Sequence, residues 1–267
     1  MYVLCLLQTE VLEEKTWIDK PRLYDSDRLA LENNKWLTDN IINAAQTFLR
    51  KQHSQAVGLR DTVVLQSGDF TFDATSNVIQ CVHDPVYEHW FTVSTVGCPL
   101  NTINVYCSLQ MVPSPRCVKV ITSAVKFCAS KVCFRVQNVA KQSGKDDCGL
   151  FAIAYAVTLL SGQDPVNVVY EQHLMRPHLI DCLDRQRIDQ FPVACQRTVR
   201  RSYVRVFECV LYCRCRKSYV RGDQMVTCDK CKMWLHTVCE QMSDVSFELH
   251  VKEKGKAYVC TACVMSA

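Results

Sequence analysis

The pattern of hydrophobic and polar positions between residues 38 and 160 predicts helices at both ends and strands between them. Residues 39–52, capped by Thr38, repeat apolar side chains at helical spacing and predict an amphipathic helix. Its apolar face consists of Ile41, Ile42, Ala45, Phe48 and Leu49. Strands are expected at residues 62–65, 78–82, 89–96, 102–109 and 132–139, and another helix is expected at residues 114–130.

A second helix is expected at residues 148–160, which are apolar on almost every side. Such a helix is buried over most of its surface. Helices that flank a run of strands indicate an α+β domain.

The composition of the chain is that of a globular protein. Of its 267 residues, 48% are hydrophobic and 22% are charged, which argues against disorder and leaves room for a medium and a small domain. The net charge of +4 permits contact with nucleic acid but does not argue for it, because such binding usually shows as a dense basic patch.

The N-terminus lacks the features of an export signal. A short apolar run is followed by Glu10, Glu13 and Glu14, whereas a signal peptide begins with basic residues and has a longer apolar core. No stretch approaches the roughly 18 to 20 apolar residues that cross a bilayer, so we expect no membrane segment. The 18 cysteines then indicate a reducing compartment, where thiols are zinc ligands, nucleophiles or small buried hydrophobes.

The distribution of the cysteines divides the chain. Ten are scattered over residues 1–195, and eight crowd into residues 209–267. Residues 196–208 between them begin with a polar, arginine-rich stretch without periodicity, which we interpret as a basic linker. Its arginines suggest nucleic-acid contact only weakly, since a solvated connector explains them as well.

The C-terminal cysteines are spaced as zinc ligands. Close pairs of cysteines suit a tetrahedral ion, and eight ligands make two four-ligand sites. The ligands are Cys213, Cys215, Cys228, Cys231, His236, Cys239, Cys260 and Cys263. A module of this size buries too little apolar surface to be comfortably stable, and structural zinc, worth about 10–16 kcal/mol in small finger peptides, closes the gap. Cys209 falls outside the pattern and is expected to be a small buried hydrophobe.

The order of four cysteines, one histidine and three cysteines, with Trp234 two places before the histidine, resembles the PHD finger. A RING finger has its histidine one ligand earlier. The resemblance implies two structural Zn²⁺ ions in cross-braced sites. One site would hold Cys213, Cys215, His236 and Cys239, and the other Cys228, Cys231, Cys260 and Cys263.

PHD fingers commonly bind histone H3 tails, and some hold a methylated lysine in an aromatic cage. The cage positions match Tyr212, Tyr219, Met225 and Trp234, and a quaternary ammonium over aromatic faces gains roughly 0.5 to 2 kcal/mol. Alternatively, the two tyrosines merely cover a small core. Fingers for unmodified tails usually offer acids, and only Asp223 and Asp229 are near.

Candidate catalytic groups stand in the first domain. Cys148 opens the buried helix, where the positive end of the helix dipole favours a thiolate, and Gly149 lets the backbone approach closely. Gln142, six residues earlier, offers an amide for an oxyanion, and His89 at the head of a strand offers a base. Singly, each is weak evidence, because most lone cysteines are small buried hydrophobes.

Along the chain, the segment that begins at Trp36 is followed by His89, then by Gln142 and then by Cys148. This order, over residues 25–190, resembles the Ulp/sentrin-specific protease family. In papain the cysteine comes first. The resemblance implies a papain-like fold and cleavage after the terminal Gly-Gly of a small ubiquitin-like (SUMO-type) modifier. Cys148 would be the nucleophile, His89 the base and Gln142 the oxyanion donor, while Trp36 and Trp90 would form a flat tunnel for glycines. Either tryptophan could instead be an ordinary core residue.

One position departs from the family. Its acid lies in a Tyr-Asp-Ser stretch, and here Cys107 stands between Tyr106 and Ser108. A neutral thiol cannot stabilise an imidazolium as a carboxylate does. Asn101 and Asn104 are nearby amides and are alternative candidates for orienting the ring. His83 is a second histidine with no match in the family, and we expect it at the surface.

Two hypotheses follow. The chain is either a nuclear deconjugating cysteine protease brought to chromatin by its finger, or a chromatin-binding adaptor whose protease-like domain binds the modifier without cutting it. A third interpretation, weakly favoured by the abrupt N-terminus, is a relic of a mobile element.

Overall fold

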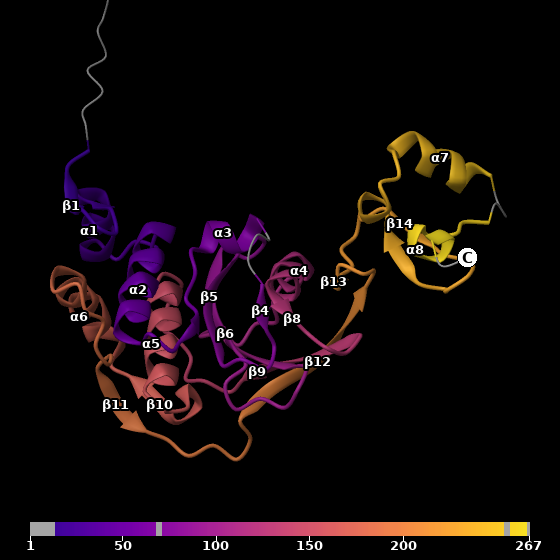
Figure 1. Ribbon diagram of the computed structural model, residues 1–267. Helices are drawn as coiled ribbons and strands as arrows, with labels where there is room; N and C mark the ends of the chain where they lie inside the picture. Colours follow the sequence, from indigo (N-terminus) through magenta and orange to yellow (C-terminus); the bar gives the residue numbers. More distant parts are fainter. Residues whose placement is uncertain (1–13, 68–70, 254–256, 266–267) are drawn as a thin grey trace, which may run out of the picture.

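The computed structural model describes residues 14–67, 71–253 and 257–265. The expectation of an N-terminus without an export signal therefore lies mostly outside the described residues. Figure 1 shows a larger mixed domain and, beyond the last strand of its sheet, a small C-terminal module. None of the described helices is long and apolar enough to cross a bilayer.

The helices and strands are interspersed along the chain. The α-helices are α1 (Asp25–Glu32), α2 (Asp39–Gln52), α3 (Thr62–Ser67), α4 (Pro115–Ala124), α5 (Cys148–Leu160), α6 (Gln172–Asp184), α7 (Asp244–Lys252) and α8 (Thr261–Met265). The strands of the larger domain are β1 (Thr16–Ile18), β2 (Leu23–Tyr24), β3 (Val57–Gly58), β4 (Phe72–Asp73), β5 (Val78–Asp84), β6 (His89–Ser94), β7 (Thr102–Tyr106), β8 (Val125–Lys126), β9 (Lys131–Gln137), β10 (Val168–Tyr170) and β11 (Val193–Gln196). The strands that follow are β12 (Tyr203–Tyr212), β13 (Lys217–Ser218), β14 (Met225–Thr227) and β15 (Trp234–His236).

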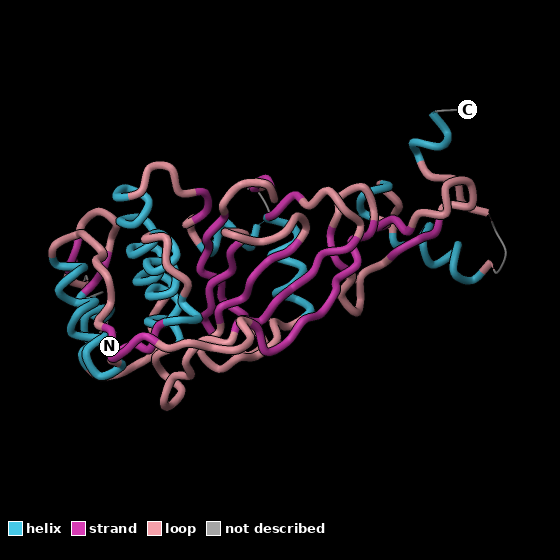
Figure 2. The backbone as a smooth tube through the Cα atoms, turned by 90° about the horizontal axis from the view of Figure 1, so that it is seen from below, coloured by secondary structure: helices cyan, strands magenta, loops and turns pink. Residues whose placement is uncertain are grey.

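A seven-stranded sheet in the order β13-β12-β9-β7-β6-β5-β3 forms the centre of the larger domain. It is mixed, because β7 pairs with β9 and β3 with β5 in parallel, whereas the other pairs are antiparallel. One hydrophobic cluster joins the sheet to α2, α5 and α6, and a second joins its other face to α4. Figures 1 and 2 show helices on both sides of the strands, which confirms the α+β class.

The predicted buried helix is α5, and its start is held close to the sheet and to α2. All but its last residue are buried, and the Thr92 hydroxyl of β6 donates to the Ala152 carbonyl at 2.6 Å. A Cβ atom on Gly149 would lie 2.9 Å from the Leu37 Cβ, so glycine is required next to Cys148. The packing of α5 thus fixes Cys148 against neighbouring elements.

Two predicted elements are wrong. Residues 62–65, expected as a strand from their β-branched side chains, begin the helix α3, because the Asp61 carboxylate accepts hydrogen bonds from the N–H groups of Val63 and Val64. The helix expected at residues 114–130 ends at Ala124, where the chain turns into β8 and pairs with β4.

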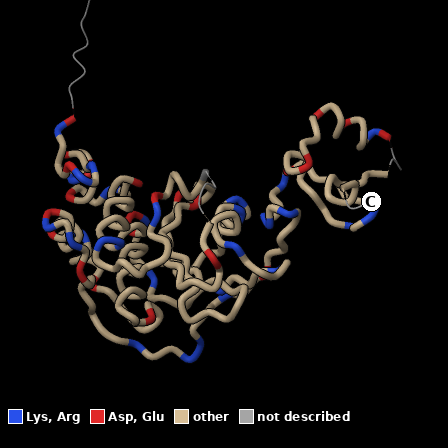
Figure 3. Tube along the Cα trace, in the orientation of Figure 1, with Lys and Arg blue, Asp and Glu red and all other residues tan. Residues whose placement is uncertain are grey.

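The expected linker is hydrogen-bonded to the larger domain in its first half and forms a strand in its second half. Arg197 N–H donates to the Asn167 carbonyl at 2.9 Å, and the Ser202 carbonyl accepts from Asn138 N–H at 2.7 Å. Residues 203–208 belong to β12, which pairs with β9 along the sheet, and Phe207 stacks on Phe134 with ring centroids 5.0 Å apart. Basic residues lie along the remaining connection, while residues of both charges are interspersed over the larger domain (Figure 3). The strand that leads into the C-terminal module is therefore part of the larger domain's sheet.

A second contact joins the two parts. The Lys119 ammonium of α4 lies 2.5 Å from the Asp223 carboxylate, and the Thr122 hydroxyl lies 3.5 Å from that of Ser218. Both ion-pair side chains are largely buried. The C-terminal module thus rests on α4 as well as on β12.

Candidate functional site

Cys148 lies at the start of α5, against the head of β6, which begins with His89. Burial raises the pKa of the Cys148 thiol, and hydrogen bonds with the backbone of Trp90 and Gly149 offset this only in part. Burial therefore opposes the thiolate that the helix terminus is expected to favour. The hydrogen bond with Trp90 does place the thiol beside the residue that follows His89.

The side chain of Cys107 contacts the ring of His89, as its position in the sequence predicts. Its Sγ atom lies 3.3 Å from His89 Nε2, and both side chains are almost completely buried. Burial lowers the pKa of His89 to about 4, although the nearby Asp84 carboxylate acts in the opposite direction. Burial likewise raises the pKa of the Cys107 thiol. At neutral pH this contact joins a neutral imidazole to a neutral thiol.

The side-chain amides of Asn101 and Asn104 form hydrogen bonds with residues other than His89. Asn101 Oδ1 accepts hydrogen bonds from the N–H groups of Cys128 and Ala129. Asn104 Oδ1 accepts from Gln137 Nε2 at 2.7 Å. Neither amide takes the place of the missing acid, and Cys107 alone occupies it.

Gln142 lies buried in the loop before Cys148. Its Oε1 atom accepts a 2.5 Å hydrogen bond from the Ser108 hydroxyl, and its Nε2 donates to the Gly144 carbonyl at 3.1 Å. The amide is thereby held in place, and the contact with Gly144 uses only one of its two N–H groups.

A buried ion pair, which the sequence analysis missed, holds the same loop from the other side. Arg176 Nη2 lies 2.7 Å from the carboxylate of Asp147, the residue before Cys148, and Gln172 Nε2 donates to this carboxylate at 2.6 Å. Arg176 also donates to the carbonyl of Asp146. Its position 29 residues after Asp147 gave no signal in the sequence.

The two tryptophans line one cleft with Cys148. Its volume is about 370 Å³. Trp36 is 47% exposed, which excludes an ordinary core role, whereas Trp90 is 6% exposed. His83, expected at the surface, lies half-buried in the cleft wall with its ring centroid 4.7 Å from that of Trp90. The structure thus brings the candidate nucleophile and both candidate tunnel residues together in one cleft and adds a histidine.

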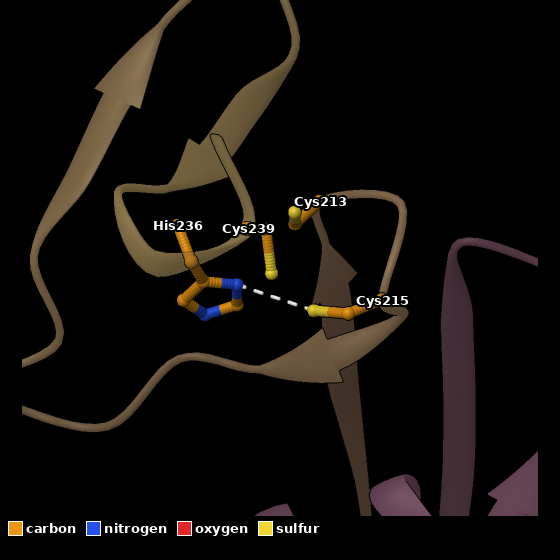
Figure 4. Close-up of side chains that lie close together, drawn as sticks. All are labelled: Cys213, Cys215, His236 and Cys239. Atoms are coloured by element: carbon orange, nitrogen blue, oxygen red, sulfur yellow. Dashed lines mark hydrogen bonds between the residues drawn. The ribbon is translucent and has the colours of Figure 1, made fainter. Parts of the chain in front are cut away.

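The C-terminal module gathers the eight expected ligands into two groups. One group is Cys213, Cys215, His236 and Cys239, and the other is Cys228, Cys231, Cys260 and Cys263. Within each group the ligand atoms all lie within 4.8 Å of one another. Figure 4 shows the three sulfur atoms of the first group turned toward the histidine ring. Successive ligand pairs along the sequence alternate between the two groups, which is the predicted cross-braced arrangement.

The distances fit tetrahedral zinc. Zinc–sulfur bonds of about 2.3 Å and zinc–nitrogen bonds of about 2.0 Å imply separations of about 3.8 Å between two sulfurs and about 3.5 Å between sulfur and nitrogen. The Cys231 and Cys260 sulfurs are 3.9 Å apart, and Cys215 Sγ lies 3.2 Å from His236 Nδ1. Nε2 of His236 faces away and lies 3.9 Å from the Asp223 carboxylate. The donor set therefore suits zinc.

A carboxylate that the sequence analysis missed connects the two groups. Glu240 accepts hydrogen bonds from Thr261 N–H at 2.8 Å and from the Tyr258 hydroxyl at 2.9 Å. It also lies 3.2 Å from Arg214, which stands between Cys213 and Cys215 and donates to Cys260 Sγ at 3.0 Å. Since the Glu240 side chain is almost fully buried, this network fixes both sites relative to each other.

The four cage candidates lie on neighbouring segments. Tyr212 and Tyr219 line one groove, while Met225 and Trp234 lie on the paired strands β14 and β15. The Trp234 carbonyl accepts a 2.9 Å hydrogen bond from Cys213 N–H, next to Tyr212. Trp234 and Tyr219 are each about half exposed, so neither is a simple core residue.

Comparisons with known proteins concern both parts of the chain. Solved structures similar to it include a de-sumoylating protease (14% identity, TM-score 0.46, 62% of this chain and 86% of that one). Another is the C-terminal Ulp1 protease domain in complex with Smt3, the yeast ortholog of SUMO (12% identity, TM-score 0.47, 62% and 84%). A third is Ulp1 with its catalytic cysteine oxidised to a sulfonic acid (12% identity, TM-score 0.48, 65% and 89%).

A search of the curated proteins finds no match to the chain. The family model of the PHD finger matches residues 213–263. This range begins and ends at the outermost of the eight ligand residues. The C-terminal module of the chain is a PHD finger.

Proposed function

We propose that the larger domain is a cysteine isopeptidase that cleaves after the terminal Gly-Gly of SUMO-type modifiers, and that the PHD finger directs it to chromatin in the nucleus. The observation that carries the proposal is the cleft that Cys148 lines together with Trp36 and Trp90. Flat aromatic walls beside a nucleophile admit a peptide without side chains and reject bulkier ones.

The reaction follows from the residues around Cys148. Because Nε2 of His89 is taken by Cys107, Nδ1 is the ring nitrogen left to accept the thiol proton. The thiolate sulfur attacks the glycine carbonyl, and the Gln142 amide stabilises the oxyanion. The imidazolium returns its proton to the leaving lysine amine, and water then hydrolyses the thioester.

A second candidate function is supported by the Cys107–His89 contact. A neutral thiol at 3.3 Å leaves an imidazolium without a counter-charge. In serine proteases, neutralising the triad acid costs about 10⁴ in turnover. The alternative is a modifier-binding adaptor with impaired catalysis, and the enzyme proposed above is accordingly slow.

An electrophilic probe tests the enzyme proposal. A SUMO-type modifier that carries a vinyl sulfone in place of its C-terminal carboxylate should label the full chain at Cys148. Labelling should disappear in Cys148→Ala and persist in Cys195→Ala, which removes an exposed cysteine elsewhere. Labelling that survives Cys148→Ala would refute the nucleophile assignment. Modifier binding without labelling would favour the adaptor.

For the finger, we propose that two zinc ions hold its loops and that it binds the histone H3 tail through a methylated lysine. Zinc would supply only structure here, since each group has four protein ligands. The half-exposed Trp234 and Tyr219 support the cage, because exposed rings offer faces for a quaternary ammonium. Binding of a trimethylated H3 peptide that is unchanged in both Trp234→Ala and Tyr219→Ala would discard the cage.

A further inference from the structure

The first group of zinc ligands, drawn in Figure 4, is held against the larger domain. Arg216, which directly follows a ligand cysteine, donates to the backbone carbonyls of Phe127 and Ala129. Ser218 N–H donates to the Thr122 hydroxyl of α4 at 3.4 Å. The larger domain thus holds the loop that carries the first two ligands.

One ring nitrogen of His236 is buried and has no hydrogen-bond partner among the described residues. Nδ1 lies 3.2 Å from Cys215 Sγ, toward the other ligands, whereas Nε2 faces away from them. A histidine that binds a metal through one nitrogen usually donates its other N–H to a carboxylate, a carbonyl or water. The Asp223 carboxylate lies 3.9 Å from Nε2, and a movement of about 1 Å completes the hydrogen bond.

Asp223 is held in this position by a residue of the larger domain. Its carboxylate accepts a 2.8 Å hydrogen bond from Val220 N–H and lies 2.5 Å from the Lys119 ammonium of α4. The side chains of Asp223 and Lys119 are 18% and 29% exposed, so salt screens this pair only weakly. Both line one cavity of about 390 Å³ together with three of the four ligands of the first group.

The charge of the first site favours the same arrangement. Zinc binds cysteine as the thiolate, so a group that holds one Zn²⁺ with three thiolates carries an excess of negative charge. The Lys119 ammonium offsets this charge together with that of Asp223. At the second group the corresponding cation is Arg214, which belongs to the finger and donates to Cys260 Sγ at 3.0 Å. The two sites therefore take their cations from different domains.

We propose that the larger domain completes the first zinc site, because Lys119 fixes the Asp223 carboxylate and this carboxylate orients His236 from the side opposite the metal. The proposal rests on the structural zinc proposed above and adds that the two zinc sites are not equivalent. Lys119 and Asp223 are positioning residues, since neither binds the metal. The affinity of the first site for zinc therefore depends on α4, whereas that of the second depends on the finger.

Competition between the full chain and a fluorescent zinc chelator measures both affinities. Alkylation of the cysteines, followed by peptide mass spectrometry, identifies the site that has lost its metal, because zinc protects the thiolates that bind it. Lys119→Met and Asp223→Ala should each weaken the first site between about tenfold and a hundredfold, the usual effect of losing a partner of a metal-bound histidine. The thiols of the first group should then react at a chelator concentration that leaves those of the second group protected.

Two further variants serve as controls. Lys119→Arg keeps the positive charge beside Asp223 and should bind zinc at the first site within about threefold of wild type. Lys131→Met removes an exposed ion pair with Glu208, away from the ligands, and should change neither affinity by more than about twofold.

The outcomes separate this proposal from the structural zinc on which it rests. Weakening of the first site alone, in Lys119→Met and Asp223→Ala but not in Lys119→Arg, supports the proposal. Equal weakening of both sites, or of neither, would overturn it, because a general loss of stability does not select one group. A loss in Lys119→Arg as large as in Lys119→Met would overturn the role of the charge. Wild-type chain that binds no zinc would overturn the structural metal as well.

Discussion

Cys107 Sγ meets His89 Nε2 at 3.3 Å, directly after the end of β7, so a thiol stands where a carboxylate would orient the imidazole. Cys107→Asp should therefore raise turnover, by up to about 10⁴ on the scale of the serine-protease triad. The carboxylate would also raise the pKa of His89 from about 4, because it stabilises the imidazolium. Single-turnover cleavage of a modifier–fluorophore fusion measures the gain.

The control for this variant is Cys107→Ser, which keeps a small neutral group and should stay near wild-type activity. A rate in Cys107→Asp that does not exceed the rate in Cys107→Ser would show that the missing charge does not limit catalysis.

The buried His89 should make the fold sensitive to acid. Its pKa of about 4 lies below the unfolded value near 6.5, so only the unfolded chain binds this proton between these pH values. The contribution of the neutral His89 to the free energy of unfolding should be fully present above pH 6.5. The free energy of unfolding should then fall by about 3 kcal/mol as the pH drops to 4. Urea titrations at several pH values measure this slope.

His89→Gln should flatten the slope, whereas His173→Gln, at an exposed position, should leave it unchanged. Burial lowers the pKa of His83 as well, so a residual slope in the same direction is expected. Identical slopes in wild type and His89→Gln would contradict the buried neutral imidazole.

Much of the architecture was predictable from local patterns, and the misses have physical reasons. The helices α2 and α5 follow from their apolar spacing, and the membership of the two ligand groups follows from the resemblance to the PHD finger. The segment that became α3 has β-branched residues, and its helix depends on the Asp61 cap. β12 was missed because its partner β9 lies more than sixty residues earlier and its own sequence begins among arginines.

The same reasoning applies to the sites. Cys148, His89 and Cys107 stand out because motif order carries their roles. Arg176 and Glu240 do not, since an ion pair across 29 residues and a hydrogen bond across 21 leave no trace in local spacing. Side chains that position other side chains are visible only once the chain is folded.

Removal of zinc should unfold the finger and leave the larger domain folded. The module has a small apolar cluster built largely of its own ligands, whereas metal binding is worth about 10–16 kcal/mol in comparable fingers. Amide hydrogen exchange after treatment with a chelator should show loss of protection in β14 and β15 but not in β5 and β6. Restored protection on addition of zinc is the control, and protection that a chelator leaves intact would count against a structural metal.

Truncation should show whether the larger domain needs β12 for its thermal stability. A chain that ends after Ser202 loses the strand that covers β9 and exposes Phe134, so its larger domain should melt at a clearly lower temperature or fail to fold. A chain that ends after Tyr212 keeps the strand and should melt within a few degrees of the full protein. Thermal unfolding of the two truncations decides the matter, and equal midpoints would show that β12 is dispensable.

The passage of one strand from the sheet into the finger has a mechanical consequence. A pull on the finger along the direction of β12 would load its ladder with β9 in shear, so that several hydrogen bonds must break together. A pull across the strand would open them one at a time. Tension applied to the finger would therefore reach the sheet of the larger domain with a strength that depends on its direction.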